Sequence, residues 1–146
     1  LGSGEWEYEN YFRYLHDKHP DKVGITIGFV PDLARKIYAG ADLFLMPSKS
    51  EPCGLSQMVA LRYGTVPIVR ETGGLKDSIT DCGDGQGNGF TFKTYDAYDM
   101  LGAIYRGVDA YNSKDWNVLV KRALECDMSW GKSANEYIKM YRSLLK

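Results

Sequence analysis

Residues 43–57 read LFLMPSKSEPCGLSQ, and this stretch decides the predicted fold. Its first four residues form a continuous apolar run, which is typical of a β-strand buried on both faces of a sheet. Residues 55–63 carry a helical pattern, and Gly64 stands where a helix commonly ends. A buried strand that passes through a short polar loop into a helix is the repeating unit of a parallel α/β sheet.

The preceding segments add two helices and one strand to this unit. Residues 8–15 carry aromatic and apolar side chains at helical spacing and predict an amphipathic helix. Residues 23–29 (VGITIGF) are rich in β-branched residues and are bounded by turn formers, so they predict a strand. Asp32 is predicted to be the N-cap of a short helix that buries Leu33 and Ile37.

The following segments continue the alternation and end in helices. Residues 66–69 (VPIV) predict another short strand, residues 72–74 (TGG) open a turn, and residues 83–89 (GDGQGNG) predict a flexible surface loop. Three apolar stripes then predict three helices. The side chains expected to face the core are Leu101, Ile104, Tyr105 and Val108; Trp116, Leu119, Val120, Ala123 and Leu124; and Ala134, Tyr137, Ile138, Tyr141, Leu144 and Leu145.

Strands alternating with helices predict a doubly wound parallel sheet with helices on both faces. A length of 146 residues fits one domain over residues 1–146 and leaves no room for a second domain of comparable size. The chain begins LGSG, without an initiator Met, which we interpret as a cut within a longer protein.

Composition excludes several classes of function. Lys and Arg total 18 against 19 Asp and Glu, and this balance gives no electrostatic case for a nucleic-acid or anionic-membrane partner. The three cysteines, Cys53, Cys82 and Cys126, are odd in number and lack CxxC spacing, so neither a disulfide framework nor a structural zinc site is predicted. The sequence offers no apolar run of about 20 residues and no signal peptide.

The loop after the strand at residues 43–46 predicts a ligand site. Ligands of open parallel sheets bind beyond the carboxyl ends of the strands, at the switch point. The Glu51 carboxylate can accept hydrogen bonds from two neighbouring hydroxyls, as in a sugar ring. The N–H groups of Cys53, Gly54 and Leu55 lie where a helix leaves donors unpaired, which favours phosphate or sugar oxygens.

The loop at residues 70–77 (RETGGLKD) repeats this design. Gly73 and Gly74 either face the ligand or only shape the loop, because glycine permits close backbone approach in both cases.

His16 and His19 have a metal-ligand spacing but lie on a polar helix face, so no metal site is predicted. A dinucleotide-binding dehydrogenase is disfavoured because no GxGxxG follows a strand.

At these residues the chain resembles the bacterial glycogen synthases and plant starch synthases. The resemblance rests on SKSEPCGLSQ at residues 48–57 and LRYGTVPIVRETGGLKDSI at residues 61–79. It extends to YAGADLFLMPS at residues 38–48, to NGF at residues 88–90 and to the SW…A…Y…Y ending, and so covers essentially the whole chain.

The resemblance implies a GT-B fold, in which two Rossmann-like domains enclose the active site. It implies transfer of glucose from ADP-glucose to the non-reducing end of an α-1,4-glucan, with retention of configuration and without a metal or other cofactor. Residues 1–146 would be the C-terminal, nucleotide-sugar-binding domain, truncated at its N-terminus and inactive without its partner domain. The implied location is the cytoplasm, or the plastid for a plant protein.

The resemblance also assigns roles to residues. Glu51, the catalytic candidate, would hold hydroxyls of the transferred glucose. The backbone amides of Cys53, Gly54 and Leu55 would bind the sugar and help to place the diphosphate. Phe29 falls where the family usually has a Tyr that stacks on adenine, and its ring keeps the stacking face.

The resemblance extends to the second loop, and the chain departs from the family's pattern at two points. Thr72, Gly73 and Gly74 would also contact the substrate. Many related enzymes hold the ribose with a Glu where this chain has Val59, and Gln57 is a nearby polar candidate for that contact. The Arg and Lys that neutralise the diphosphate in the family lie upstream of this chain.

Two other functions remain open from the sequence. One is a UDP-glucose-dependent enzyme similar to sucrose or trehalose synthases, which share looser forms of these motifs. The other is a nucleotide-sugar-binding module without catalysis.

Overall fold

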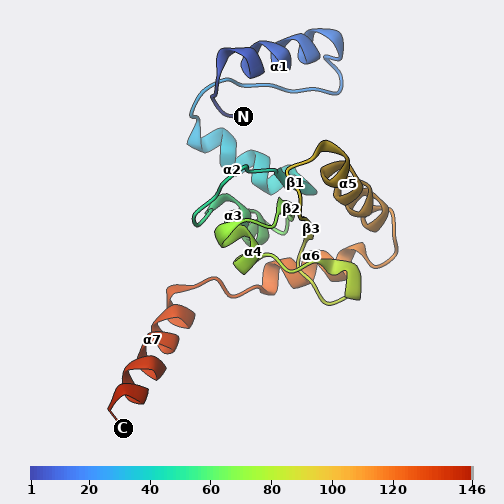
Figure 1. Cartoon of the computed structure of the whole chain (residues 1–146). Helices are drawn as coiled ribbons and strands as arrows, with labels where there is room; N and C mark the ends of the chain where they lie inside the picture. Colours follow the sequence, from blue (N-terminus) through green and yellow to red (C-terminus); the bar gives the residue numbers. More distant parts are fainter. Residues whose placement is uncertain (146) are drawn as a thin grey trace. The chain divides into compact units, whose positions relative to one another are not determined.

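The computed structural model describes residues 1–145. The chain divides into two compact units, Leu1–Ile37 and Tyr38–Lys146 (Figure 1). The helices and strands are α1 (Trp6–Lys18), α2 (Pro31–Gly40), β1 (Leu43–Met46), α3 (Ser56–Tyr63), β2 (Val66–Arg70), α4 (Gly73–Ser78), the 3₁₀ helix η1 (Cys82–Asp84), β3 (Phe90–Phe92), α5 (Ala97–Tyr111), α6 (Trp116–Glu125) and α7 (Trp130–Leu144).

The first unit contains the predicted helix α1 but not the predicted strand. Residues 23–29 form only an isolated parallel bridge between Gly2 and Ile27. Its hydrogen bonds run from Gly2 N–H to the Thr26 oxygen at 3.2 Å and from Gly28 N–H to the Gly2 oxygen at 2.8 Å. A β-branched segment becomes a strand only where a partner chain runs beside it, and here the partner is a single residue. The predicted strand at residues 23–29 is therefore wrong.

Helix α2 is present, although its predicted details differ. Pro31 is its first residue, so Asp32 lies inside the first turn and is not the N-cap. The Asp32 carboxylate pairs instead with Arg35, one turn later. Leu33 is half-buried, but Ile37 is 41% exposed, so the predicted burial of Ile37 is wrong.

The second unit is built on a parallel three-stranded sheet in the order β1-β2-β3. Leu43 is paired with Val66 in the first ladder, and Ile68 with Phe90 in the second. The strands at residues 43–46 and 66–69 are confirmed. Strand β3 was not predicted from the sequence, since its three residues are too few to establish a period of two.

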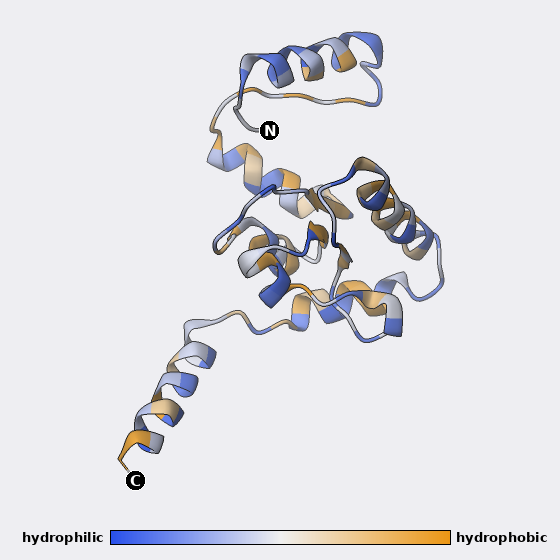
Figure 2. Ribbon diagram, viewed as in Figure 1, coloured by the Kyte–Doolittle hydropathy of each residue, from blue (hydrophilic) through white to orange (hydrophobic). Residues whose placement is uncertain are grey.

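Helices cover both faces of this sheet, as predicted. On one face, Val66 and Ile68 pack with Phe90, Phe92 and Ala103 of α5. Figure 2 shows the strands mostly in hydrophobic colours and α5 with both hydrophobic and hydrophilic segments, whereas α1 is mostly hydrophilic.

The opposite face is covered by α3 and α4. There Val69 packs with Leu61 of α3 and Leu75 of α4. Helix α6 contributes to both faces, through Leu119 on the α5 side and Ala123 on the other. The alternation of β2 side chains between two helical layers is the packing of a buried parallel strand.

Strand β1 is less buried than predicted. Its Leu45 side chain is 41% exposed, because β1 is paired only with β2 and forms an edge of the three-stranded sheet. The prediction that this strand is buried on both faces is wrong.

Helix α5 turns a different face to the core than its apolar stripe predicts. Ala103 and Gly107 are the buried residues, whereas Leu101, Tyr105 and Val108 are exposed. A Cβ on Gly107 would lie 3.0 Å from Cδ1 of Ile68, so the small residues allow α5 to approach β2 closely. The core face of α5 therefore consists of small residues that pack closely on β2, and not of the large apolar residues from which it was predicted.

The loop at residues 83–89 is only half a surface loop. Gly87, Asn88 and Gly89 are buried. The Asn88 side chain accepts a hydrogen bond from Thr80 N–H at 2.8 Å and donates one to the Ser78 oxygen at 3.0 Å. The amide therefore ties the buried half of the loop to the segment after α4.

The three C-terminal helices are present as predicted, but α7 buries no residue. Its predicted core face is exposed at Tyr137, Ile138, Tyr141 and Leu144. Helix α6 follows its predicted stripe more closely, with Leu119 and Ala123 buried. Among residues 1–145, no helix combines the length and the apolar character that crossing a bilayer requires.

Candidate functional site

The candidate site lies at the edge of the sheet where the parallel strands have their carboxyl ends. Residues 47–55 leave β1 and enter α3, while Glu71 and Thr72 leave β2 and enter α4. Because β1 and β2 are parallel neighbours, both loops leave from the same edge. The strands described in residues 1–145 follow one another in chain order, so they contain no reversal that would form the predicted switch point.

The two loops contact each other through their backbones. A Cβ on Gly73 would lie 1.9 Å from the Glu51 carbonyl oxygen, and a Cβ on Gly74 would lie 2.0 Å from the Cys53 carbonyl oxygen. Gly74 N–H donates to the Pro52 carbonyl oxygen at 3.3 Å. Both glycines are therefore required by the contact between the loops, and the Gly74 N–H is already bonded within the protein.

Three successive carbonyl groups of the first loop accept hydrogen bonds from the interior. The Pro52 oxygen accepts from Gly74 N–H, and the oxygens of Cys53 and Gly54 accept from Nε2 of Gln57 at 3.4 Å and 2.9 Å. In a trans peptide the C=O and the following N–H point in opposite directions. The N–H groups of Cys53, Gly54 and Leu55 are thereby directed away from these interior partners.

These N–H groups lead into the N-terminus of α3. Gly54 has φ +73°, and no side chain caps the helix at Leu55. Within residues 1–145, no hydrogen bond uses the N–H of Cys53, Gly54 or Leu55. Unpaired donors at the positive end of a helix dipole favour an anionic or hydroxylated ligand.

Glu51 is half-buried beside these donors. Its carboxylate has one long contact, from the Ser48 hydroxyl at 3.5 Å, and no ion pair among the described residues. It therefore keeps the capacity to accept hydrogen bonds from ligand hydroxyls. Cys53 and Leu55 are exposed and Gly54 is buried, so the backbone of this segment rather than its side chains defines the site.

Arg70, at the end of β2, holds the start of the Glu51 loop. Its Nε donates to the Ser48 oxygen at 2.8 Å, and its guanidinium also bonds the Lys49 oxygen. The guanidinium carbon lies 5.8 Å from the centre of the Tyr95 ring. No role was predicted for Arg70 from the sequence, although a cation at the end of a buried strand beside the site loop was a visible signal.

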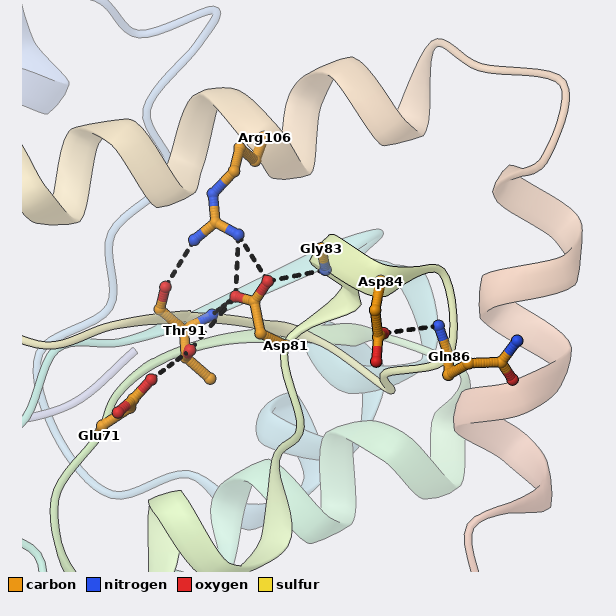
Figure 3. A network of polar contacts seen from close by, with 7 residues as sticks. All are labelled: Glu71, Asp81, Gly83, Asp84, Gln86, Thr91 and Arg106. Carbon is orange, nitrogen blue, oxygen red and sulfur yellow. Dashed lines mark hydrogen bonds and ion pairs between the residues drawn. The ribbon is translucent and has the colours of Figure 1, made fainter.

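A second network fixes the start of the other loop (Figure 3). The Thr91 hydroxyl donates to Glu71 at 2.8 Å, and Thr91 N–H donates to the Asp81 carboxylate at 2.6 Å. Arg106 of α5 bonds both Asp81 oxygens, at 2.7 and 2.8 Å, and the Thr91 carbonyl oxygen at 2.6 Å. This network connects α5 and β3 to Glu71, which directly precedes Thr72.

The environment of Asp81 acts on its pKa in two directions. Partial burial raises the pKa, whereas hydrogen bonds from Arg106, Thr91 N–H and Gly83 N–H, together with the Arg106 charge, lower it. The lowering contributions prevail, and the pKa of the Asp81 carboxyl lies below its ordinary value. The carboxylate therefore remains charged where it connects these elements.

The remaining residues that were assigned to the site differ in their position and exposure. Phe29 belongs to the Leu1–Ile37 unit, where its ring is 91% exposed. Thr72 precedes α4 in extended conformation, and Val59 is 38% exposed on α3. Gln57 is fully buried, so the predicted ribose contact from its side chain is wrong.

The described residues contain no group of three His, Cys, Asp or Glu side chains that could hold a metal ion. What the site presents is backbone N–H donors and one available carboxylate. These groups, at this edge of a parallel α/β unit, are of the kind that suits a polar ligand rich in oxygen.

The chain belongs to the group 1 glycosyl transferases, whose family model matches residues 2–110. It is 52% identical over 149 aligned residues to the glycogen synthase of Bacillus cereus and 52% identical to that of Geobacillus thermodenitrificans. Each alignment includes 100% of this chain and 31% of the relative. The chain thus spans about a third of the length of these relatives.

Solved structures agree with this assignment. The catalytic domain of starch synthase IV from Arabidopsis thaliana, bound to ADP and acarbose, matches with a TM-score of 0.83 and 36% identity, over 99% of this chain and 31% of that one. Sucrose-phosphate synthase from Thermosynechococcus elongatus matches with a TM-score of 0.67 at 22% identity, over 99% of this chain and 37% of that one, a likeness of fold alone. The expected GT-B-type α/β fold and the resemblance to glycogen and starch synthases are confirmed.

Proposed function

We propose that this chain is the donor-binding part of a retaining glucosyltransferase that transfers glucose from ADP-glucose to the non-reducing end of an α-1,4-glucan. The observation that carries the proposal is the set of unpaired N–H groups at Cys53, Gly54 and Leu55 beside the Glu51 carboxylate. It is supported by 52% identity to a glycogen synthase and by the likeness to a starch synthase structure bound to ADP.

The chemistry of such a transfer suits these groups. Breaking the bond between the anomeric carbon and the phosphate oxygen leaves negative charge on ADP and oxocarbenium character on the sugar. Backbone donors at the N-terminus of α3 stabilise the developing charge without rearranging during the reaction. Glu51 accepts hydrogen bonds from the glucose hydroxyls and orients the ring. The proposed reaction involves no metal ion or other cofactor.

The remaining site residues have supporting roles in this proposal. The exposed Phe29 ring stacks on adenine. Thr72 and Gly73 contact the substrate from the second loop, whereas Gly74 contributes by holding Pro52. We propose that the cations that neutralise the diphosphate are supplied by the rest of the enzyme.

The partners and location follow from the same reaction. A glucan chain is the acceptor, and the active site is completed by the part of the enzyme that corresponds to the other two-thirds of the relatives. We place the protein in the cytoplasm, which suits its three free thiols at Cys53, Cys82 and Cys126.

Calorimetric titration with ADP-glucose, UDP-glucose, ADP and UDP tests donor binding by this chain. We expect the adenine nucleotides to bind and the uridine nucleotides to bind more weakly. A preference for UDP-glucose would favour the sucrose- or trehalose-synthase type of enzyme instead. Failure to bind any of the four would refute the proposal.

Transfer itself is tested in a chimera in which this chain replaces the matching 31% of the Bacillus cereus glycogen synthase. We expect the chimera to elongate glycogen from ADP-glucose and the separate 146-residue chain to transfer no glucose. A chimera that binds ADP-glucose but does not elongate glycogen would support a binding module without catalysis.

A further inference from the structure

Gln57 is the first residue of interest, because it is a buried polar side chain with an unsatisfied atom. It is 0% exposed, and its Oε1 has no hydrogen-bond partner among the described residues. A buried acceptor without a donor loses its hydrogen bonds to water on folding and so destabilises the folded state. A methionine or leucine would fill a similar volume without that cost, so packing alone does not account for an amide at this position.

The amide nitrogen of Gln57 explains what the side chain does. Nε2 donates to the Gly54 carbonyl oxygen at 2.9 Å and to the Ser78 hydroxyl oxygen at 3.0 Å. The Ser78 hydroxyl in turn donates to the Gly74 carbonyl oxygen at 2.7 Å. One buried amide thus connects the loop before α3 to the first and last turns of α4.

The bond to Gly54 fixes one peptide plane in particular. The Gly54 carbonyl and the Leu55 N–H belong to the same trans peptide, so holding the oxygen inward directs the Leu55 N–H outward. Gly54 itself gives little restraint, because glycine at φ +73° has a wide choice of conformations. The restraint on this donor therefore comes from Gln57.

Gln57 also closes the space around Gly54. A Cβ on Gly54 would lie 2.6 Å from Oε1 of Gln57 and 2.9 Å from Cδ2 of Leu75. The amide and the glycine thus fit as a pair, and neither is replaceable without moving the other.

We propose that Gln57, supported by Ser78, is a positioning residue for glucosyl transfer. Its buried amide preorganises the Leu55 N–H toward the diphosphate of the nucleotide sugar. This inference rests on the proposed function. The benefit is entropic: a glycine-containing loop that is already ordered loses less freedom when the anion binds.

The test uses Gln57→Met, which keeps the size and removes the amide, and Ser78→Ala, which removes the support. ADP affinity is measured by calorimetry and thermal stability by circular dichroism. We expect about 10-fold weaker ADP binding for Gln57→Met and a smaller loss for Ser78→Ala. The matched control is Leu119→Ala, a buried position in α6 that lowers Tm without touching either loop.

A loss of affinity in Leu119→Ala equal to that in Gln57→Met would mean that affinity only follows stability, and would overturn the inference. The double variant Gln57→Met/Ser78→Ala adds a second criterion. If the two residues act through one bridge, its loss of affinity is less than the sum of the single losses. Strict additivity would contradict a shared bridge.

NMR on the ligand-free chain separates this inference from the proposed function. Residual dipolar couplings of the Leu55 amide report the direction of its N–H bond, and we expect them to change in Gln57→Met while those of α5 stay constant. If ADP binds and Gln57→Met alters neither the coupling nor the affinity, Gln57 has no positioning role and the proposed function stands. If the unaltered chain binds no ADP, the proposed function fails and the positioning role fails with it.

Discussion

At the scale of single residues, glycine is what allows two loops to form one site. Gly73 and Gly74 stand where any side chain would overlap carbonyl oxygens of the first loop. Gly54 occupies a left-handed conformation and is packed against a buried amide. At these three of the chain's 16 glycines, the absence of a side chain therefore has a local structural cause, which is the close packing of the two loops at the ligand edge.

Gly74→Ala tests this account. The new methyl group would lie 2.0 Å from the Cys53 carbonyl oxygen, so the loops must separate. We expect a loss of about 1–3 kcal/mol in unfolding free energy and weaker ADP binding. Urea unfolding and calorimetry measure the two effects.

Gly102→Ala is the matched control for that substitution. Gly102 lies inside α5, and a Cβ there would meet no atom within 4 Å. We expect Gly102→Ala to stabilise the chain by about 0.4–1 kcal/mol and to leave ADP binding unchanged. Equal effects of the two substitutions would show that space at Gly74 is not what matters.

Glu51→Gln tests the proposed contact with the sugar. The carboxylate has few contacts within the protein, so we expect unfolding free energy to change by less than about 0.5 kcal/mol. ADP-glucose affinity should fall about 10-fold while ADP affinity stays within about two-fold. Calorimetry with both ligands gives the comparison, and Glu125→Gln on the exposed face of α6 is the control. A parallel loss for ADP would place Glu51 against the nucleotide instead of the sugar.

The sequence was enough to locate the candidate site only where the pattern lies within one short segment of the chain. Residues 47–57 run from an apolar strand into a helix, and this order alone placed their N–H groups at a strand end. Gln57 was misassigned, because sequence does not say whether a polar side chain at a helix start turns toward solvent or inward. Arg70 and the Asp81–Arg106 pair were missed, since their partners are 21–25 residues away along the chain.

At the scale of helices and strands, the predictions were confirmed where residues within an element mark its end. Helix α3 ends at Gly64, whose φ of +79° is the expected left-handed cap. Residues 23–29 had strand composition but only one bridging residue as a partner, and strand formation depends on that partner. In α5 the buried residues are Ala103 and Gly107, which no hydrophobic pattern distinguishes from an exposed face.

Helix α7 provides a prediction at this scale. None of its residues is buried, so it adds little to the core of the Tyr38–Lys146 unit. We expect a chain that ends at Ser129 to retain its Tm within about 2 °C and its ADP affinity within about two-fold. Thermal unfolding by circular dichroism and calorimetry provide the measurements. A large fall in Tm would mean that α7 packs on the sheet unit in solution.

At the scale of the whole molecule, stability and site geometry depend on the same long-range contacts. The Asp81 carboxylate bonds the helix α5 through Arg106 and the strand β3 through Thr91, and Thr91 in turn bonds Glu71 at the start of the second loop. In the sheet unit, the charge of Asp81 therefore links α5 and β3 to the ligand edge. We expect removal of the Asp81 charge to lower the stability of the fold and, as a consequence, to disturb the ligand edge.

The pH dependence of unfolding tests this role of Asp81. The folded-state pKa of this carboxyl lies below its unfolded value, so its contribution to stability is present above the unfolded pKa and is lost as pH falls through the folded pKa. We expect Asp81→Asn to lower unfolding free energy at pH 7 by about 1–2 kcal/mol, because Arg106 and Thr91 N–H lose a charged acceptor. Urea unfolding between pH 7 and pH 2.5 should show the two proteins converging below the ordinary aspartate value of 3.8. Asp127 and Glu136, whose pKa values are also lowered, owe this to groups other than Asp81 and Arg106, so their titration is expected to cancel in the difference. A stability difference that stays constant down to pH 2.5 would mean that the Asp81 charge is not what holds α5 and β3 together.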